Sequence, residues 1–549
     1  MFRGTKNILP LLIILTLLGG ILHFFNLNWG APYYFHPDER NIASAISQLN
    51  FPSQMNPHFF AYGSLPIYVI YFTGLLANYS LHLLQPTTHN PQPTFDQAII
   101  ISRFYSALFA TLLIPLLFLI GKKIKDQKTG LITAFLTTTS VGFIQFSHFG
   151  TFEMWLTFFT TVLFYLCLQL PKRTSFQSLA LVALTSGTLV AIKISHLAMI
   201  PLILLAISLQ GTYQNIQRHH IYKFWRIMGS YCLFILLAGT IYFLTNPYVL
   251  RDATSFLSTM QYESSVALGT LPVFYTGEFL NSIPVFFQFQ NIYPFLLNPL
   301  ITLIFIASFI YLIYKIIKTK SFDLFLLISF FLALFLSQAF LFVKWTRYMI
   351  PTLPFIYLII AVALNNFFSF NKKILYSKHY IFGGLVFICS VFALSYFITT
   401  FMEPDTRIAA RNFSQNNIPS DSPILSEVYD LGITPFNNNF GHIELFNFYD
   451  LEPNSLLTSE LEVKMTASEY IILPSQRILK TRLAKKEQFP KGYEFYEPLT
   501  SGRLAYKQIY ISQCSIFCKI TYLGSPVFQY EQTASVFDRP TVMIFQKIK

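Results

Sequence analysis

The chain has 549 residues, of which 53% are hydrophobic and only 11% are charged, and its mean hydropathy is +0.49. A soluble protein of this length would need far more charge to cover its surface. The net charge of +13 lies in short clusters between apolar runs, not in a basic stripe with exposed aromatics, which argues against nucleic acid as a partner. Apolar runs of about 20 residues match helices that cross a bilayer. The composition therefore predicts a mainly α-helical, multi-pass membrane protein surrounded by lipid.

Eleven apolar segments are expected to span the membrane. The first follows Arg3 and Lys6 and has no convincing cleavage site after it, which favours a retained span with a cytoplasmic N-terminus over a cleaved signal peptide. The stretch 177–209 is interpreted as two short spans, because one long helix would bury Lys193 in hydrocarbon. The predicted spans are 8–25, 98–120, 131–149, 152–170, 177–192, 196–209, 228–245, 295–314, 322–343, 349–369 and 380–401.

The charge of the loops supports this count and sets the orientation. Lysine and arginine cluster in the predicted inner loops, whereas the outer segments 26–97 and 246–294 contain no lysine. The inner loops are 121–130, 171–176, 214–226, 314–320 and 371–378. An odd number of spans places the C-terminal part outside the cell membrane.

Two domains are therefore predicted. Residues 1–401 form the transmembrane domain, with 26–97 as its first outer loop, and residues 402–549 form an outer mixed α/β domain. The segments PILSEVYDLG, SEYIILPS and PTVMIFQKIK in the second domain resemble short buried strands. Cys514 and Cys518 could form a disulfide there if the compartment is oxidising, or could remain two reduced thiols.

The stretch YYFHPDERNIASAI, residues 33–46, gathers charge just after the first span. Pro37 favours the first helical position, which places Asp38 and Glu39 in the first turn, where free N–H groups and the helix dipole favour anions. Apolar residues follow at helical spacing, so this helix is expected to lie along the membrane face. The simplest interpretation is that the two acids cap a surface helix.

Three more charged places at the outer membrane boundary favour a functional site. Glu153 begins a span among aromatic residues and is either functional or a boundary residue exposed to water. Lys344 and Arg347 lie at an outer span end against the charge rule, which either a lipid phosphate or interfacial snorkelling would explain. Lys193 could add a cation or mark the boundary, and His148 is more simply a hydrogen-bonded polar residue.

Residues 8–400 resemble the polytopic GT-C glycosyltransferases, specifically the family 39 group, which includes protein O-mannosyltransferases and aminoarabinose transferases. The matching pieces are the acids of FHPDE, GSLPIYVIYF, ISRFYSALFATLLIPLLFLIGKKI, the acid that opens the fourth span, the lysine of AIKISH, and KWTRYMIPTLPF. The resemblance implies an enzyme of the plasma (inner) membrane. It would move a sugar from a polyprenyl-phosphate donor to a hydroxyl of a lipid, glycan or protein acceptor on the outer face, with inversion.

The resemblance also implies roles for the acids. Asp38 would be the general base, Glu39 would organise the site, and Glu153, where relatives more often have Asp, would orient the acceptor or the base. A polyprenyl phosphate leaves without a general acid, so one essential acid is enough. The three carboxylates could bind a divalent cation. Metal-free catalysis is expected, and no cofactor is assigned.

The cations would bind the donor. Arg347, together with Lys193 and Lys344, would hold the lipid phosphate and stabilise its developing charge. Further candidates for the site are His36, His148 and Tyr348. In the second outer segment, Arg251, Tyr262 and Glu263 are candidates for donor or acceptor binding, although loop solvation is the simpler explanation of all three.

Two other functions are compatible with the sequence. A transporter or flippase of a lipid-linked sugar would favour broken spans near the bilayer midplane and an inverted repeat. A non-enzymatic envelope protein, whose outer domain binds a partner, would not need charges from distant segments to converge at the membrane boundary.

Overall fold

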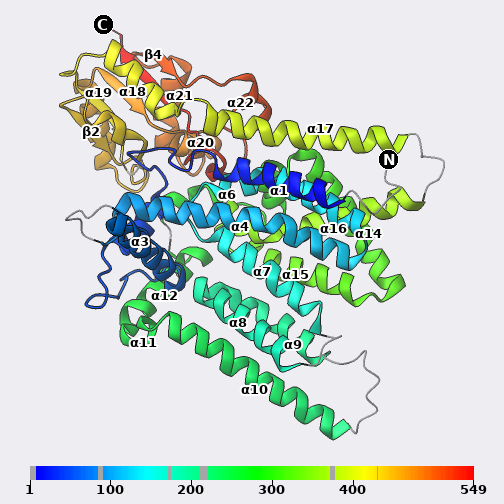
Figure 1. Ribbon diagram of the computed structural model, residues 1–549. Coiled ribbons are helices and arrows are strands. Elements are labelled where there is room, and N and C mark those ends of the chain that lie inside the picture. The colour runs from blue at the N-terminus through cyan, green and yellow to red at the C-terminus, as the bar shows by residue number, and fades with distance from the viewer. Residues whose placement is uncertain are drawn as a thin grey trace. The chain divides into compact units, whose positions relative to one another are not determined.

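The structure, a computed structural model, describes residues 8–84, 91–170, 175–209, 220–271, 273–370, 377–428 and 431–548 (Figure 1). The chain divides into two compact units. The first comprises Met1–Leu27, Asp38–Gly269 and Leu296–Ser390, and the second comprises Asn28–Pro37, Thr270–Phe295 and Val391–Lys549. Residues 171–174, 214–219 and 371–376 of the predicted inner loops lie outside the described residues. The domain boundary placed at residue 401 stays a prediction.

The first unit is helical. Its elements are α1 (Ile8–Phe24), α2 (Pro37–Ser47), α3 (Ser64–Leu84), α4 (Phe95–Ile124), α5 (Gln127–Thr138), α6 (Val141–Ser147), α7 (Glu153–Cys167), α8 (Phe176–Ile192), η3 (Ile194–Met199), α9 (Ile200–Ser208), α10 (His220–Thr245), α11 (Tyr248–Arg251), α12 (Ala253–Leu268), α14 (Pro299–Thr319), α15 (Phe322–Ala339), η6 (Thr346–Thr352), α16 (Leu353–Phe370) and most of α17 (Ser377–Phe397). Helix α4 packs against both α1 and α7, and α8 runs beside α10 (Figure 1).

The helices confirm a multi-pass membrane protein. Among the described residues, six helices are long and apolar enough to cross a membrane by length and composition, and the count is seven if α5 and α6, which meet at a bend of 54°, form one span. Shorter apolar helices account for the other predicted segments. The segment 131–149 differs from the expected single helix, because the Ser140 hydroxyl accepts a hydrogen bond from the Phe143 amide and so caps a new helix.

Two local predictions are confirmed. Helix α2 begins at Pro37, with Asp38 and Glu39 in its first turn. Lys193 has an extended backbone (φ −155°, ψ 121°) between α8 and η3, so the stretch 177–209 is indeed two helical pieces. The charged side chain therefore lies at a break in the helices and not along one of them.

The second unit contains the only sheet found among the described residues. Its elements are η4 (Phe274–Phe279), η5 (Gln288–Ile292), α13 (Tyr293–Leu296), η8 (Ile398–Met402), α18 (Thr406–Asn417), β1 (Ile424–Glu427), η9 (Leu431–Phe436), β2 (Ile443–Phe446), α19 (Leu456–Ala467), β3 (Tyr470–Leu473), α20 (Arg477–Ala484), α21 (Pro490–Ser501), β4 (Tyr506–Ile511), α22 (Ile516–Thr521), η10 (Gln532–Ala534) and β5 (Met543–Lys547).

The five strands form a mixed sheet in the order β2-β1-β3-β5-β4. Strand β1 is parallel to β2 and β3, and β5 is antiparallel to β3 and β4. Alternate side chains enter two cores, one with residues of α19, α20 and α21 and the other with residues of α18. The unit is therefore a three-layer α/β structure. The predicted strands are β1, β3 and β5, whereas β2 and β4, the half-exposed edge strands, were not predicted.

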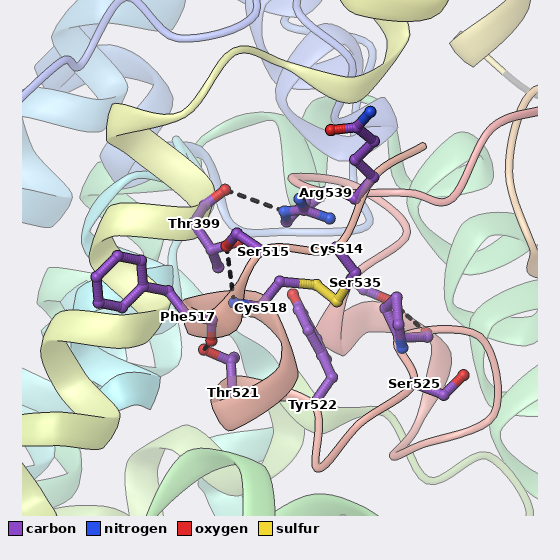
Figure 2. Close-up of a disulfide and its surroundings, with 12 residues drawn as sticks. Thr399, Cys514, Ser515, Phe517, Cys518, Thr521, Tyr522, Ser525, Ser535 and Arg539 are labelled. Carbon is purple, nitrogen blue, oxygen red and sulfur yellow. Dashed lines mark hydrogen bonds between the residues drawn. A yellow bond between two sulfur atoms is a disulfide. The ribbon is translucent and has the colours of Figure 1, made fainter. Parts of the chain in front are cut away.

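A disulfide joins Cys514 to Cys518, which decides between the two alternatives that the sequence left open (Figure 2). Cys518 lies in α22, whose first turn is capped by Ser515 through a hydrogen bond from the Cys518 amide to the serine hydroxyl. Cys167, Cys232 and Cys389 are free thiols.

Thiol labelling tests this bridge directly. We expect a denatured, unreduced sample to take up alkylating reagent at three cysteines and a reduced sample at all five, as measured by the intact mass. The three free thiols serve as the internal control. Labelling of five cysteines without reductant would show that the bridge does not form.

Candidate functional site

An ion pair connects two segments that are 309 residues apart in the chain. The first turn of α2 presents Asp38, and η6 presents Arg347, whose Nη1 donates to Asp38 Oδ2. Both side chains are 27% exposed. The carboxylate and the guanidinium predicted to belong to one site are therefore in contact, at a position that solvent or a ligand can reach.

Tyr62, in the loop before α3, connects this pair to Glu153. The Tyr62 hydroxyl donates to Glu153 Oε1 at 3.4 Å, and Arg347 Nη1 donates to the Tyr62 oxygen at 3.5 Å. The Tyr62 side chain is buried, and this burial raises the pKa of its phenol well above the usual value. Tyr62 therefore remains a neutral hydrogen-bond donor between the acid and the cation.

Glu153 has one carboxylate oxygen without a hydrogen-bond partner among the described residues. The residue is 2% exposed and opens α7, where the free N–H groups of the first turn favour a negative charge. Its Oε1 accepts from Tyr62, whereas Oε2 has no such partner. Since buried polar atoms are usually hydrogen-bonded, this oxygen is available to a ligand.

Two cations lie beside these acids in one open pocket. Lys193 Nζ is 5.3 Å from the ring centre of Tyr62 and 5.0 Å from that of Tyr348, and the Arg347 guanidinium is 5.8 Å from the Tyr348 ring. The pocket has about 460 Å³ of empty space, including its open side, and its lining includes Glu153, Lys193, Arg347 and Tyr348. Further polar lining comes from Ser195, His196, Ser337 and Gln338.

Glu39 is fully occupied by protein contacts. Arg103 of α4 donates two hydrogen bonds to it, from Nε to Oε1 at 2.8 Å and from Nη2 to Oε2 at 2.7 Å. Both side chains are completely buried. The Gly150 amide also donates to Oε1 at 2.5 Å, and Arg103 Nη1 donates to the Leu27 carbonyl. Such a fork fixes the start of α2 relative to α4.

The loop that carries Tyr62 is pressed against the end of α8. The Gly63 amide donates to the Ile192 carbonyl at 2.9 Å, and a Cβ at Gly63 would lie 1.9 Å from the Ala191 oxygen. The Ser64 amide donates to Asn246 Oδ1 at 2.6 Å. Only glycine allows this approach of two backbones, and it holds Tyr62 next to Lys193.

Asp38 and Glu39 lie outside the lining of this pocket, and so do three further candidates. Lys344 is buried and donates to the Phe342 carbonyl at 3.0 Å. His148 is buried, with its two ring nitrogens next to the carbonyl oxygens of Ile144 and Phe25. His36 belongs to the second unit, where its ring packs against that of Phe537. These contacts give each of the three a role in packing.

Tyr62 and Arg103 are the residues that the sequence analysis missed. For Arg103 a signal existed, because an arginine inside an apolar span must find an acid or leave the bilayer. For Tyr62 there was none, since a tyrosine in an aromatic loop is unremarkable by itself. Glu263 lies close enough to interact electrostatically with Lys193 and Arg347.

The acids do not form a metal site. Within the described ranges, no group of three or more histidine, cysteine, aspartate or glutamate side chains could hold a metal ion. Asp38 is paired with Arg347, and both oxygens of Glu39 accept hydrogen bonds from protein donors. The three carboxylates that the sequence offered as oxygen ligands therefore do not fit a divalent cation, and no catalytic step is derived through one.

Comparison with solved structures identifies the fold. No protein-family model matches the chain, and no curated protein matches it. The apo oligosaccharyltransferase of Archaeoglobus fulgidus matches with a TM-score of 0.52 and 13% identity, covering 100% of this chain and 89% of that one. The same enzyme tethered to an acceptor peptide matches with a TM-score of 0.50 and 12% identity, covering 99% and 89%.

A bacterial enzyme is also similar. ArnT from Cupriavidus metallidurans bound to undecaprenyl phosphate matches with a TM-score of 0.48 and 11% identity, covering 99% of this chain and 98% of that one, which is too weak to support a conclusion. At the identities of the Archaeoglobus matches, the likeness establishes the fold alone. The chain has the fold of the GT-C glycosyltransferases, which are polytopic membrane proteins, as its sequence predicted.

Proposed function

We propose that the protein is a membrane glycosyltransferase that moves a sugar from a polyprenyl-phosphate donor to an acceptor hydroxyl. One observation carries the proposal: Asp38 and Arg347, distant in the chain, pair beside a pocket that also presents Glu153 and Lys193. The GT-C fold, shared with an oligosaccharyltransferase, supports glycosyl transfer by analogy.

The cations would bind the donor phosphate. The planar fork of Arg347 matches two phosphate oxygens, and Lys193 supplies a second positive charge in the same pocket. As the bond between the anomeric carbon and the phosphate oxygen breaks, its electron pair leaves with the phosphate. Fixed cations stabilise that developing charge most in a site shielded from water.

Asp38 would act as the general base. The acceptor hydroxyl attacks the anomeric carbon from the face opposite the phosphate, which inverts the configuration, and its proton passes to Asp38. The open oxygen of Glu153 would accept a hydrogen bond from the acceptor or the sugar and orient it. Glu39 would position Asp38 through its pair with Arg103 and take no part in the chemistry.

The active site and residues 402–549 are proposed to face the outer side of the plasma (inner) membrane. The clusters of lysine and arginine in the alternate loops support this orientation. The disulfide between Cys514 and Cys518 also supports it, because such bridges persist outside the reducing cytoplasm.

A transport assay separates this function from the movement of a lipid-linked sugar across the bilayer. The purified protein in liposomes would be given polyprenyl-phosphate donors with labelled sugars and a membrane extract as the acceptor source. We expect release of free polyprenyl phosphate and transfer of the label to the extract. Movement of intact donor between leaflets, with no bond cleaved, would instead identify a flippase.

A further inference from the structure

The second unit has a pocket of its own. It is a hollow open to solvent, with about 220 Å³ of empty space including its open side, between η4, the residue Tyr449 and α20. Its lining combines aromatic rings, from Phe274, Tyr275 and Tyr449, with two guanidinium groups, from Arg477 and Arg482. None of these residues contributes to the transfer site described above.

The wall formed by η4 is fastened by charged contacts. Lys480 Nζ pairs with Glu278 Oε1 at 2.7 Å, and the backbone N–H of Gln532 donates to Glu278 Oε2 at 3.1 Å. Lys485 Nζ donates to the Glu278 carbonyl at 2.9 Å. The acid of the pocket is therefore already neutralised by a lysine, and η4 and α20 are held at a fixed spacing.

The two arginines have no such acid. Arg482 is 2% exposed, stacks 3.8 Å above the Phe489 ring and donates through Nη2 to the Phe448 carbonyl, but its Nε has no hydrogen-bond partner. Arg477 Nε donates to the neutral amide oxygen of Gln532 at 3.2 Å. In the described part of the chain, neither guanidinium forms an ion pair with a carboxylate.

The excess of positive charge is costly unless something compensates it. Burial lowers the pKa of the Arg482 guanidinium, and the carboxylates of Glu452 and Glu427, which act on it from beyond ion-pair distance, offset that effect only in part. An anion in the pocket would supply that counter-charge and accept hydrogen bonds from the planar guanidinium groups. The arginines therefore specify a negatively charged group on the ligand.

The rings specify the rest of the ligand. Phe274 is 40% exposed, and its ring centre is 4.5 Å from that of Tyr449, so together they present an aromatic surface at the pocket. The C–H face of a sugar ring is apolar and packs well on such a surface, while its hydroxyls can bond to polar neighbours such as Gln532.

We propose that this pocket binds an anionic saccharide, with its carboxylate or phosphate on Arg477 and Arg482 and one sugar face on Phe274 and Tyr449. The site does not depend on the transfer reaction. A carboxylated sugar and a phosphorylated sugar share this chemistry, and the experiment distinguishes them.

Calorimetric titration of the full chain in detergent tests the proposal. The probes are tri-galacturonic acid, glucose 6-phosphate and the neutral maltotriose. We expect at least one acidic probe to bind roughly tenfold more tightly than maltotriose, with an affinity that falls as salt rises. Which acidic probe binds identifies the charged group. Equal binding of the neutral probe, or no binding of either acid, overturns the proposal.

Variants locate the binding. Arg482 is buried, so Arg477→Gln and Phe274→Ala, at accessible positions, carry the test. We expect each variant to bind the acidic probe roughly tenfold more weakly. The control is Arg503→Gln, at an exposed arginine that pairs with Glu497, and its affinity for the probe should be unchanged. An equal loss in the Arg503 variant overturns the assignment. Repeating the titration with Asp38→Asn protein separates this site from the transfer site, since binding here should be unaffected.

Discussion

Replacing Asp38 by Asn is expected to lower the rate of sugar transfer by about 10²–10⁴-fold, the usual contribution of a general base. The amide keeps the size of the side chain but cannot take the acceptor proton. It also frees Arg347 from its ion pair, so donor binding should be unchanged or tighter. The test measures kcat and the KM for the donor. We expect kcat to fall and KM not to rise.

The matched control is Asp96→Asn, in the first turn of α4, where the carboxylate is exposed to solvent. We expect this variant to transfer sugar at the normal rate. The Asp38 variant should unfold at nearly the same temperature as the parent, because a partly exposed ion pair contributes little stability. Full turnover by Asp38→Asn would remove Asp38 from the mechanism.

Replacing Arg103 by Met should destabilise the protein by about 3–5 kcal/mol, the cost typical of breaking a buried ion pair on one side. The change leaves the Glu39 carboxylate buried without its cation, although the Gly150 amide still donates to it. Thermal unfolding in detergent, followed by circular dichroism, measures the effect. Transfer activity should fall too, because α2 carries Asp38.

Two further variants sharpen this result. Arg251→Met removes an exposed arginine that lies over the Tyr248 ring, and should leave the unfolding temperature nearly unchanged. The double variant Glu39→Met with Arg103→Met removes both buried charges and should recover much of the lost stability. A double variant as unstable as Arg103→Met would mean that the cost lies in packing and not in the unpaired charge.

The part of the site that could be predicted from the sequence depends on charge in an apolar setting. Four residues were recognisable because each lies at the edge of an apolar run: Asp38, Glu153, Lys193 and Arg347. A charged side chain is costly there and is therefore usually kept for a function. Their meeting could not be derived from spacing, since the ion pair joins segments 309 residues apart. The predicted spans placed all four at one membrane face, and the resemblance to a known family then assigned them roles in one site.

What the sequence could not supply depends on tertiary contact. Lys344 has the same boundary pattern as Arg347, yet its side chain turns to a backbone carbonyl. The organisation into units has the same origin. Asn28–Pro37 and Thr270–Phe295 belong to the second unit, and no composition change along the chain marks their assignment. Edge strands such as β2 lacked the buried pattern by which the central strands were recognised.

The contact at Gly63 restricts how the pocket can open. Because this glycine lies against the Ala191 oxygen and donates to the Ile192 carbonyl, the loop that carries Tyr62 and the end of α8 beside Lys193 are held together through their backbones. Asp38 and Arg347, in contrast, are paired through their side chains. For the proposed polyprenyl-phosphate donor, we therefore expect the η6 side of the pocket to adjust on binding more readily than the wall formed by Tyr62 and Lys193.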